Sequence, residues 1–174
     1  MKATKDLTLI GLYTALLIGG QLAFFAISGI EIVTLLFTAF VFYFGVIKGM
    51  VLATCFSLLR CLVFGFFPNV LILYLVFYNL FALIIGWLGN TFKHNLNVKK
   101  LLIIVGVVGL ITIFFTILDN VITPLYFGYD IEAAKAYWVL SLTAVIPQTV
   151  CACITVSLTL IPITKFFNKL NLKK

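Results

Sequence analysis

The lysines of this chain lie in short stretches that separate long apolar runs. We divide the apolar sequence into six segments, at residues 7–27, 32–47, 50–65, 70–90, 101–123 and 137–161. With this division, ten of the eleven lysines lie on one side of a membrane: Lys2, Lys5, Lys48, Lys93, Lys99, Lys100, Lys165, Lys169, Lys173 and Lys174. Only Lys135 lies on the other side. Because short loops rich in lysine and arginine stay in the cytoplasm, the pattern predicts that the N- and C-termini are both cytoplasmic.

The composition indicates an all-α integral membrane protein. Hydrophobic residues make up 64% of the chain and charged residues only 10%, and six spans of roughly 20 residues use most of its length. We therefore expect a single transmembrane domain, residues 1–174, that crosses a cell membrane of the bacterial plasma-membrane type several times. Backbone groups in lipid must be satisfied internally, and the sequence lacks strand-like alternation, so the spans are predicted to be helices. The second and third spans are expected to be short.

The net charge of +7 does not indicate nucleic-acid binding, because the lysines cluster at membrane edges, where anionic lipid headgroups attract them. The four cysteines, Cys55, Cys61, Cys151 and Cys153, fall within the third and sixth spans. Buried cysteine packs as a small hydrophobic side chain. We therefore predict no metal site and no cofactor.

Two charged side chains lie inside the predicted spans. A helix rises ~1.5 Å per residue, which places Arg60 in the outer half of the third span and Asp119 near the outer end of the fifth. An ionisable group that faces hydrocarbon costs at least ~2.5 kcal/mol, so we expect both to face a polar cavity that opens outward. The alternatives are that Arg60 reaches the outer headgroups while Asp119 sits at its helix end, or that the two form a structural ion pair.

Other polar side chains extend this pattern from the midplane outward. Asn79 and Gln148 are predicted near the midplane, Asn120 follows Asp119, and Glu31 lies at the outer start of the second span. Each amide either contacts a ligand or forms a hydrogen bond between helices.

Aromatic residues lie beside these polar groups. They are Tyr74, Phe77, Tyr78, Tyr126, Tyr129, Tyr137 and Trp138. Most are expected to pack or to form an interfacial belt, as tyrosine and tryptophan do in membrane proteins. We expect a minority to contact a ligand, since an aromatic wall with a few polar groups suits a flat, partly polar molecule.

Three small residues form a stripe along the first span. Gly11, Ala15 and Gly19 are spaced four apart, so they share one face of a helix. Small residues at this spacing allow another helix to approach closely. The stripe indicates either a docking face for a partner or packing inside the bundle.

No motif for catalysis is present in the sequence. There is no G-x-x-x-x-G-K-[ST] phosphate loop and no H-E-x-x-H motif. Asp119 is the only acid within a predicted span, whereas a membrane aspartyl protease needs two carboxylates. We expect no catalytic residues and no enzymatic function.

The chain resembles the substrate-binding S component of energy-coupling factor (ECF) transporters. The features that carry the resemblance are small size, basic charge, six helices, the stripe on the first helix, short second and third spans, and polar residues in the outer half. More local similarities lie at residues 29–32, at 117–120 and 125–128, and at 146–148. The resemblance covers essentially the whole chain.

That resemblance implies a vitamin or related micronutrient, bound from outside in a cavity formed mainly by the last three helices and the loop between the first two. By the same resemblance, the residues that line the substrate cavity are Asn79, Asp119, Asn120, Trp138 and Gln148. Arg60 and Glu31 are further candidates, although Arg60 lies on a helix that the family uses less for substrate. Two acids against one arginine favour a cationic or zwitterionic aromatic ligand.

The resemblance also implies partners. An S component docks through its first helices onto a membrane coupling subunit (T component), and two cytoplasmic ATPases drive uptake. Ala15 and Gly19 match the docking pattern A-x-x-x-A, with glycine in place of the second alanine.

Two other functions fit parts of the sequence. A membrane scaffold, similar in size and helix number to the rod-shape protein of cell-wall assemblies, would need partners but no ligand pocket. A small lipid-modifying enzyme would depend on Asp119.

Overall fold

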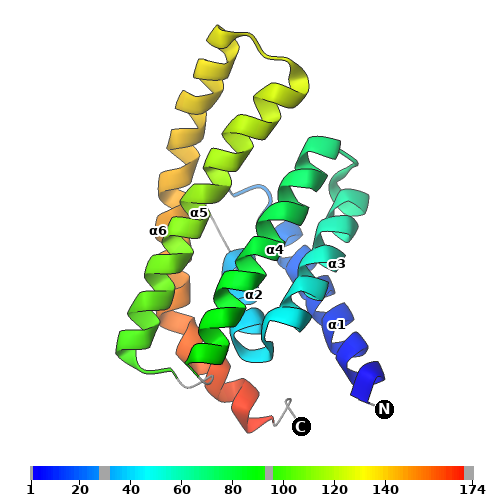
Figure 1. Ribbon diagram of the computed structural model, residues 1–174, viewed down its shortest axis with the longest axis vertical. Helices are drawn as coiled ribbons and strands as arrows, with labels where there is room; N and C mark the ends of the chain where they lie inside the picture. The colour runs from blue at the N-terminus through cyan, green and yellow to red at the C-terminus, as the bar shows by residue number, and fades with distance from the viewer. Residues whose placement is uncertain (1, 28–31, 93–95, 171–174) are drawn as a thin grey trace.

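The computed structural model describes residues 2–27, 32–92 and 96–170, and all regular structure in these ranges is helical (Figure 1). The helices are α1 (Lys2–Ala23), α2 (Ile32–Phe44), α3 (Val46–Phe64), α4 (Pro68–Thr91), α5 (Val98–Phe127) and α6 (Ile131–Lys169). Each predicted span corresponds to one of them, which confirms the all-α prediction. Five are long and apolar enough to cross a membrane, and α2 is the shorter exception.

Helix α2 is a buried central element. It has 13 residues and is therefore ~20 Å long, less than the ~30 Å of a hydrocarbon core. Eleven of its residues are buried, because α1, α3, α4 and α6 all pack against it. The prediction of a short second span is thus confirmed, whereas the third is not short, since α3 has 19 residues.

Helices α5 and α6 exceed the predicted spans. They contain 30 and 39 residues, so they are roughly 45 and 58 Å long. Figure 1 shows them as a long hairpin whose tip extends beyond the connection between α3 and α4. The turn at the tip uses Gly128 in the left-handed conformation, with φ of 64°, which glycine adopts without a steric penalty.

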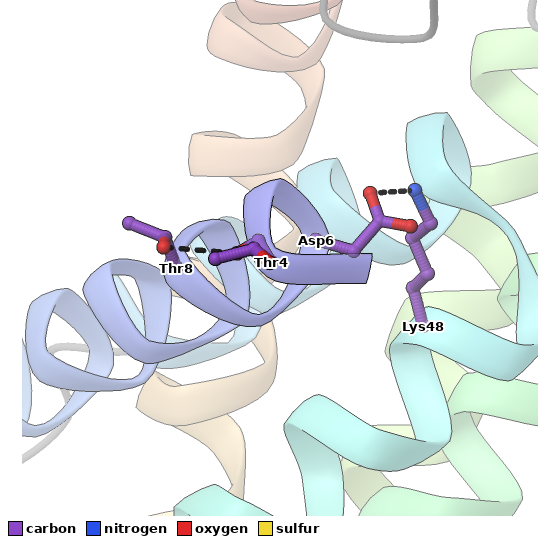
Figure 2. A network of polar contacts seen from close by, with 4 residues as sticks. All are labelled: Thr4, Asp6, Thr8 and Lys48. Atoms are coloured by element: carbon purple, nitrogen blue, oxygen red, sulfur yellow. Dashed lines mark hydrogen bonds and ion pairs between the residues drawn. The ribbon is translucent and has the colours of Figure 1, made fainter. Parts of the chain in front are cut away.

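The helices alternate in direction, so the lysine-bearing segments gather at one end of the bundle (Figure 1). At this end α1 begins, α2 meets α3, α4 meets α5, and α6 ends. Figure 2 shows the contact that joins the starts of α1 and α3, in which Lys48 Nζ lies 2.6 Å from Asp6 Oδ1. Phe167 near the end of α6 packs its ring against Tyr13 and Tyr43. We call this the lysine-rich end.

Helix α4 crosses the junction of α2 and α3 at very short range. A Cβ atom at Gly89 would lie 2.3 Å from the carbonyl oxygen of Phe42, and one at Gly86 would lie 2.8 Å from the backbone of Val46. Glycine is therefore required at both positions. Gly45 makes the turn between α2 and α3, with φ of 88°.

A proline marks the start of α4. The preceding helix ends at Phe64, and α4 begins at Pro68, at a position where a missing N–H is tolerated. Residues just after this turn reach the end of the bundle opposite the lysine-rich end, where they meet the last turns of α5.

Candidate functional site

A cavity of about 380 Å³ lies between α3, α4, α5 and α6, at the end of the bundle opposite the lysine-rich end. Its polar lining consists of Arg60, Asn69, Tyr74, Asp119, Thr123 and Tyr137. Its apolar lining consists of Phe67, Val70, Leu73, Phe115 and Phe127. Most of these side chains follow a four-residue spacing, which places them on one face of each helix.

The polar groups on α4, α5 and α6 form a continuous chain of hydrogen bonds. Asn69 Nδ2 donates to Thr123 Oγ1 at 3.3 Å, and Thr123 Oγ1 donates to Asp119 Oδ1 at 2.7 Å. The Tyr137 hydroxyl donates to Asp119 Oδ2 at 2.6 Å. Each carboxylate oxygen of Asp119 therefore already accepts one hydrogen bond from the protein.

This chain fixes the orientation of the Asn69 amide. An ionised carboxylate only accepts, so Thr123 must donate its single proton to Asp119 and can only accept from Asn69. Asn69 therefore presents its NH₂ group to Thr123. Its Oδ1 atom is buried without a hydrogen-bond partner in the described part of the chain, and the residue is only 4% exposed.

Arg60 lies against aromatic rings. Its Cζ atom is 4.2 Å from the ring centroid of Tyr74 and 5.3 Å from that of Phe64. Within the described ranges, Arg60 forms no ion pair, and its buried Nε has no hydrogen-bond partner. The alternative of a structural ion pair between Arg60 and Asp119 is therefore wrong, although both side chains line the same cavity.

Helix α1 also reaches the wall of the cavity. Gln21 Nε2 donates to the Tyr74 hydroxyl at 3.3 Å, and Gln21 Oε1 is buried without a partner among the described residues. Tyr74 thus contacts α1 through its hydroxyl and Arg60 through its ring.

Two of the predicted substrate residues, Arg60 and Asp119, line the cavity. Asn120 does not, because it points toward α6 and donates to Ser141 Oγ at 2.7 Å, with only 3% of the residue exposed. Glu31 lies outside the described residues.

The other three predicted substrate residues are absent from the lining of this cavity. Asn79 donates to the Leu75 carbonyl at 2.8 Å and lies 3.5 Å from Thr54 Oγ1 on α3, so it is engaged between the two helices. Trp138 is 40% exposed, one position from the lining residue Tyr137. Gln148 lies half-buried farther along α6.

Sequence reasoning missed Asn69, Thr123 and the phenylalanines of the wall. A signal was present in α5, where Phe115, Asp119, Thr123 and Phe127 recur every four residues and so share one face with the acid. In α4 the pairs Asn69 with Leu73 and Val70 with Tyr74 have the same spacing.

The small-residue stripe of α1 faces away from the other helices. A Cβ atom at Gly11 or Gly19 would have no neighbour within 4 Å in the described part of the chain, and Ala15 between them is exposed. Packing inside the bundle therefore does not account for these positions. Gly20, on the adjacent face, packs against Ile32 and Leu36 of α2.

No group of three or more His, Cys, Asp or Glu side chains in the described ranges is arranged to hold a metal ion. None of the four cysteines, all within the described ranges, forms a disulfide bond. Cys153 packs against Gly109 of α5, in agreement with a packing role.

Fold and site together define a class: an all-helical protein, compatible with a multi-pass membrane protein, with a polar and aromatic cavity opposite its lysine-rich end. Comparisons with models of known protein families, with curated proteins and with solved structures find no match to this chain.

Proposed function

We propose that this protein is the substrate-binding subunit of an ECF-type importer in a cell membrane, where it captures a vitamin or related micronutrient from outside. The observation that carries the proposal is the cavity at the end opposite the lysines. Lysine-rich ends stay in the cytoplasm, so a cavity at the other end is accessible from outside. A capture subunit needs its site on that side.

The lining of the cavity suits a small, flat and partly polar ligand. Phenylalanine and tyrosine account for five of its eleven lining residues, and Arg60, Asn69 and Asp119 supply directed polar groups. Its volume of about 380 Å³ falls within the range of small-molecule sites, which are mostly apolar with a few well-placed polar groups.

The exposed stripe on α1 supports docking onto a membrane coupling subunit. Gly11, Ala15 and Gly19 leave a smooth helix face with no partner among the described residues. Helices in lipid associate through such faces, because close packing replaces the missing hydrophobic force. The sequence has no phosphate-binding loop, so the energy for uptake comes from two cytoplasmic ATPases of the assembly.

The cavity also distinguishes this proposal from a membrane scaffold. A scaffold needs faces for partners, but it gains nothing from the hydrogen-bonded chain that ends at Asp119 inside a cavity. Polar groups within a membrane are costly and mark functional sites.

Ligand binding by the purified protein tests the proposal. Native mass spectrometry of protein extracted in mild detergent is expected to show a copurifying small molecule. A panel of vitamins is expected to contain one that raises the melting temperature, because a ligand that binds the folded state stabilises it.

Two variants show whether the binding uses this cavity. Asp119→Asn turns one acceptor into a donor and so breaks the hydrogen bond from Thr123 or Tyr137 that orders the cavity lining. It is expected to weaken binding at least about tenfold, or roughly 1.4 kcal/mol. Thr116→Val, on the same helix but outside the lining, is the matched control. A protein that carries no small molecule and responds to no member of the panel would contradict the proposal.

A further inference from the structure

Within the described residues, Arg60 is a charged group without a counter-ion. The guanidinium of Arg60 lies near the rings of Tyr74 and Phe64. Its five N–H donors lie in the plane of the guanidinium, and a ring face does not accept hydrogen bonds from donors in that plane. A charge that is partly withdrawn from water is normally paired and hydrogen-bonded. Arg60 therefore has unused binding capacity in the cavity that it lines.

Asp119 does not supply the missing charge. The two side chains form no ion pair, and both oxygens of Asp119 accept hydrogen bonds, from Thr123 and Tyr137. These two hydroxyl groups stabilise the carboxylate where it stands. Among the described residues, the cavity thus contains a carboxylate whose two oxygens each accept a hydrogen bond and a cation that has no ion-pair partner.

The contact with Tyr74 holds Arg60 in a useful orientation. Attraction between a cation and an aromatic ring uses the ring face, at a distance of 4.2 Å here. When a guanidinium lies over a ring, its N–H groups point sideways and remain free to form two parallel hydrogen bonds with one carboxylate or phosphate.

We propose that Arg60 binds an anionic oxygen group, a carboxylate or phosphate, carried by the flat molecule that occupies this cavity. This inference rests on the proposed function and narrows its substrate class. The remainder of the ligand packs against the phenylalanines of the wall, Phe67, Phe115 and Phe127. The expectation of a cationic or zwitterionic ligand counted two acids, Glu31 and Asp119. Glu31 lies outside the described residues, and both oxygens of Asp119 already accept hydrogen bonds.

A lipid phosphate is the other source of the same chemistry. Arg60 lies four residues before the end of α3 at Phe64, a depth from which a long side chain reaches headgroups. The experiment must therefore separate a soluble anion from a lipid.

Benzoate and benzamide are suitable probes, because they share a ring and differ in the charge of one group. We measure the melting temperature of the protein in an uncharged detergent with each probe at equal millimolar concentration. Benzoate is expected to stabilise the wild type more than benzamide does. Arg60→Gln is expected to lower the affinity for benzoate at least tenfold and to remove the preference for benzoate over benzamide.

Lys135→Gln is the control. It removes one positive charge at the same end of the bundle as Arg60, from an exposed pair with Glu132, and this variant is expected to keep the preference for benzoate.

Arg60→Lys keeps the charge but loses the planar fork, so we expect it to fold and to bind benzoate severalfold more weakly. It serves as the test if Arg60→Gln does not fold. Equal stabilisation by the two probes, no stabilisation by benzoate, or an unchanged response of the Arg60 variants would each overturn the inference.

Phosphatidylglycerol in mixed micelles provides the lipid arm. If this lipid stabilises the wild type but not Arg60→Gln, while benzoate has no effect, Arg60 is a headgroup contact and the inference is wrong. A copurifying vitamin without any anionic group would also overturn it and would leave the proposed function standing.

Discussion

At the scale of single residues, the site depends on the direction of each hydrogen bond. Asp119 accepts from two hydroxyl groups, and this makes Thr123 an acceptor toward Asn69. Removal of one of these hydroxyl groups therefore takes a hydrogen bond from one oxygen of Asp119 and alters the chain of bonds that it belongs to.

Tyr137→Phe tests this arrangement. The change deletes the 2.6 Å hydrogen bond to Asp119 Oδ2 and is expected to lower the free energy of unfolding by about 0.5–2 kcal/mol. Thermal unfolding in detergent measures the effect. Tyr129→Phe is the control, since Tyr129 is 42% exposed and lies outside the cavity lining. An equal loss in both variants would show that the bond contributes nothing specific.

The sequence identified charged residues of the site but not their companions. Arg60 and Asp119 could be found because an ionised group within an apolar run requires a polar environment. Asn79 and Gln148 were assigned by their depth and by the family resemblance, and neither determines which way a helix is rotated. Asn69 was not among the candidates, although its position at the start of α4 directs it toward α5.

At the scale of helices, the predictions were accurate for existence and poor for length. Hydropathy identified all of the helices in the described ranges, because each contains a long run of apolar residues. It ended α5 four residues early and began α6 six residues late, since the last turns of α5 and the first turns of α6 continue past the apolar runs. It also ended α6 eight residues early. The close crossing at Gly86 and Gly89 could not be found, because one sequence does not show which helices are neighbours.

Gly89→Ala tests that crossing. The added methyl group would lie 2.3 Å from the carbonyl oxygen of Phe42. This oxygen belongs to the backbone of α2, which cannot move aside as the end of a flexible side chain can. We expect a loss of about 1–3 kcal/mol or more in the free energy of unfolding. In contrast, Gly106→Ala on α5 meets nothing within 4 Å in the described part of the chain and should be neutral or stabilising by up to about 1 kcal/mol. Equal melting temperatures for the two variants would contradict the packing described here.

At the scale of the whole molecule, the cavity and the stripe lie on different surfaces. The cavity is formed by α3 to α6, whereas the stripe lies on α1, which packs mainly on α3 and α2. Capture of a ligand and docking of a partner can therefore be disrupted separately.

The double substitution Ala15→Trp with Gly19→Trp is expected to prevent copurification with a coupling subunit and its ATPases. Ligand binding should remain within about twofold, because both positions are exposed and neither lines the cavity. The two measurements are pull-down from membranes and the melting-temperature shift. Leu12→Trp, on an exposed position of the same helix outside the stripe, is the control. Copurification that survives the double substitution would exclude the stripe as the docking face.

The short length of α2 has a mechanical consequence in the proposed setting. Its neighbours enclose it, so acyl chains do not determine how long it must be, and a bilayer of different thickness acts only on the helices around it. Those outer helices can tilt to match thinner or thicker lipid, while α2 stays fixed among them without contact to the acyl chains.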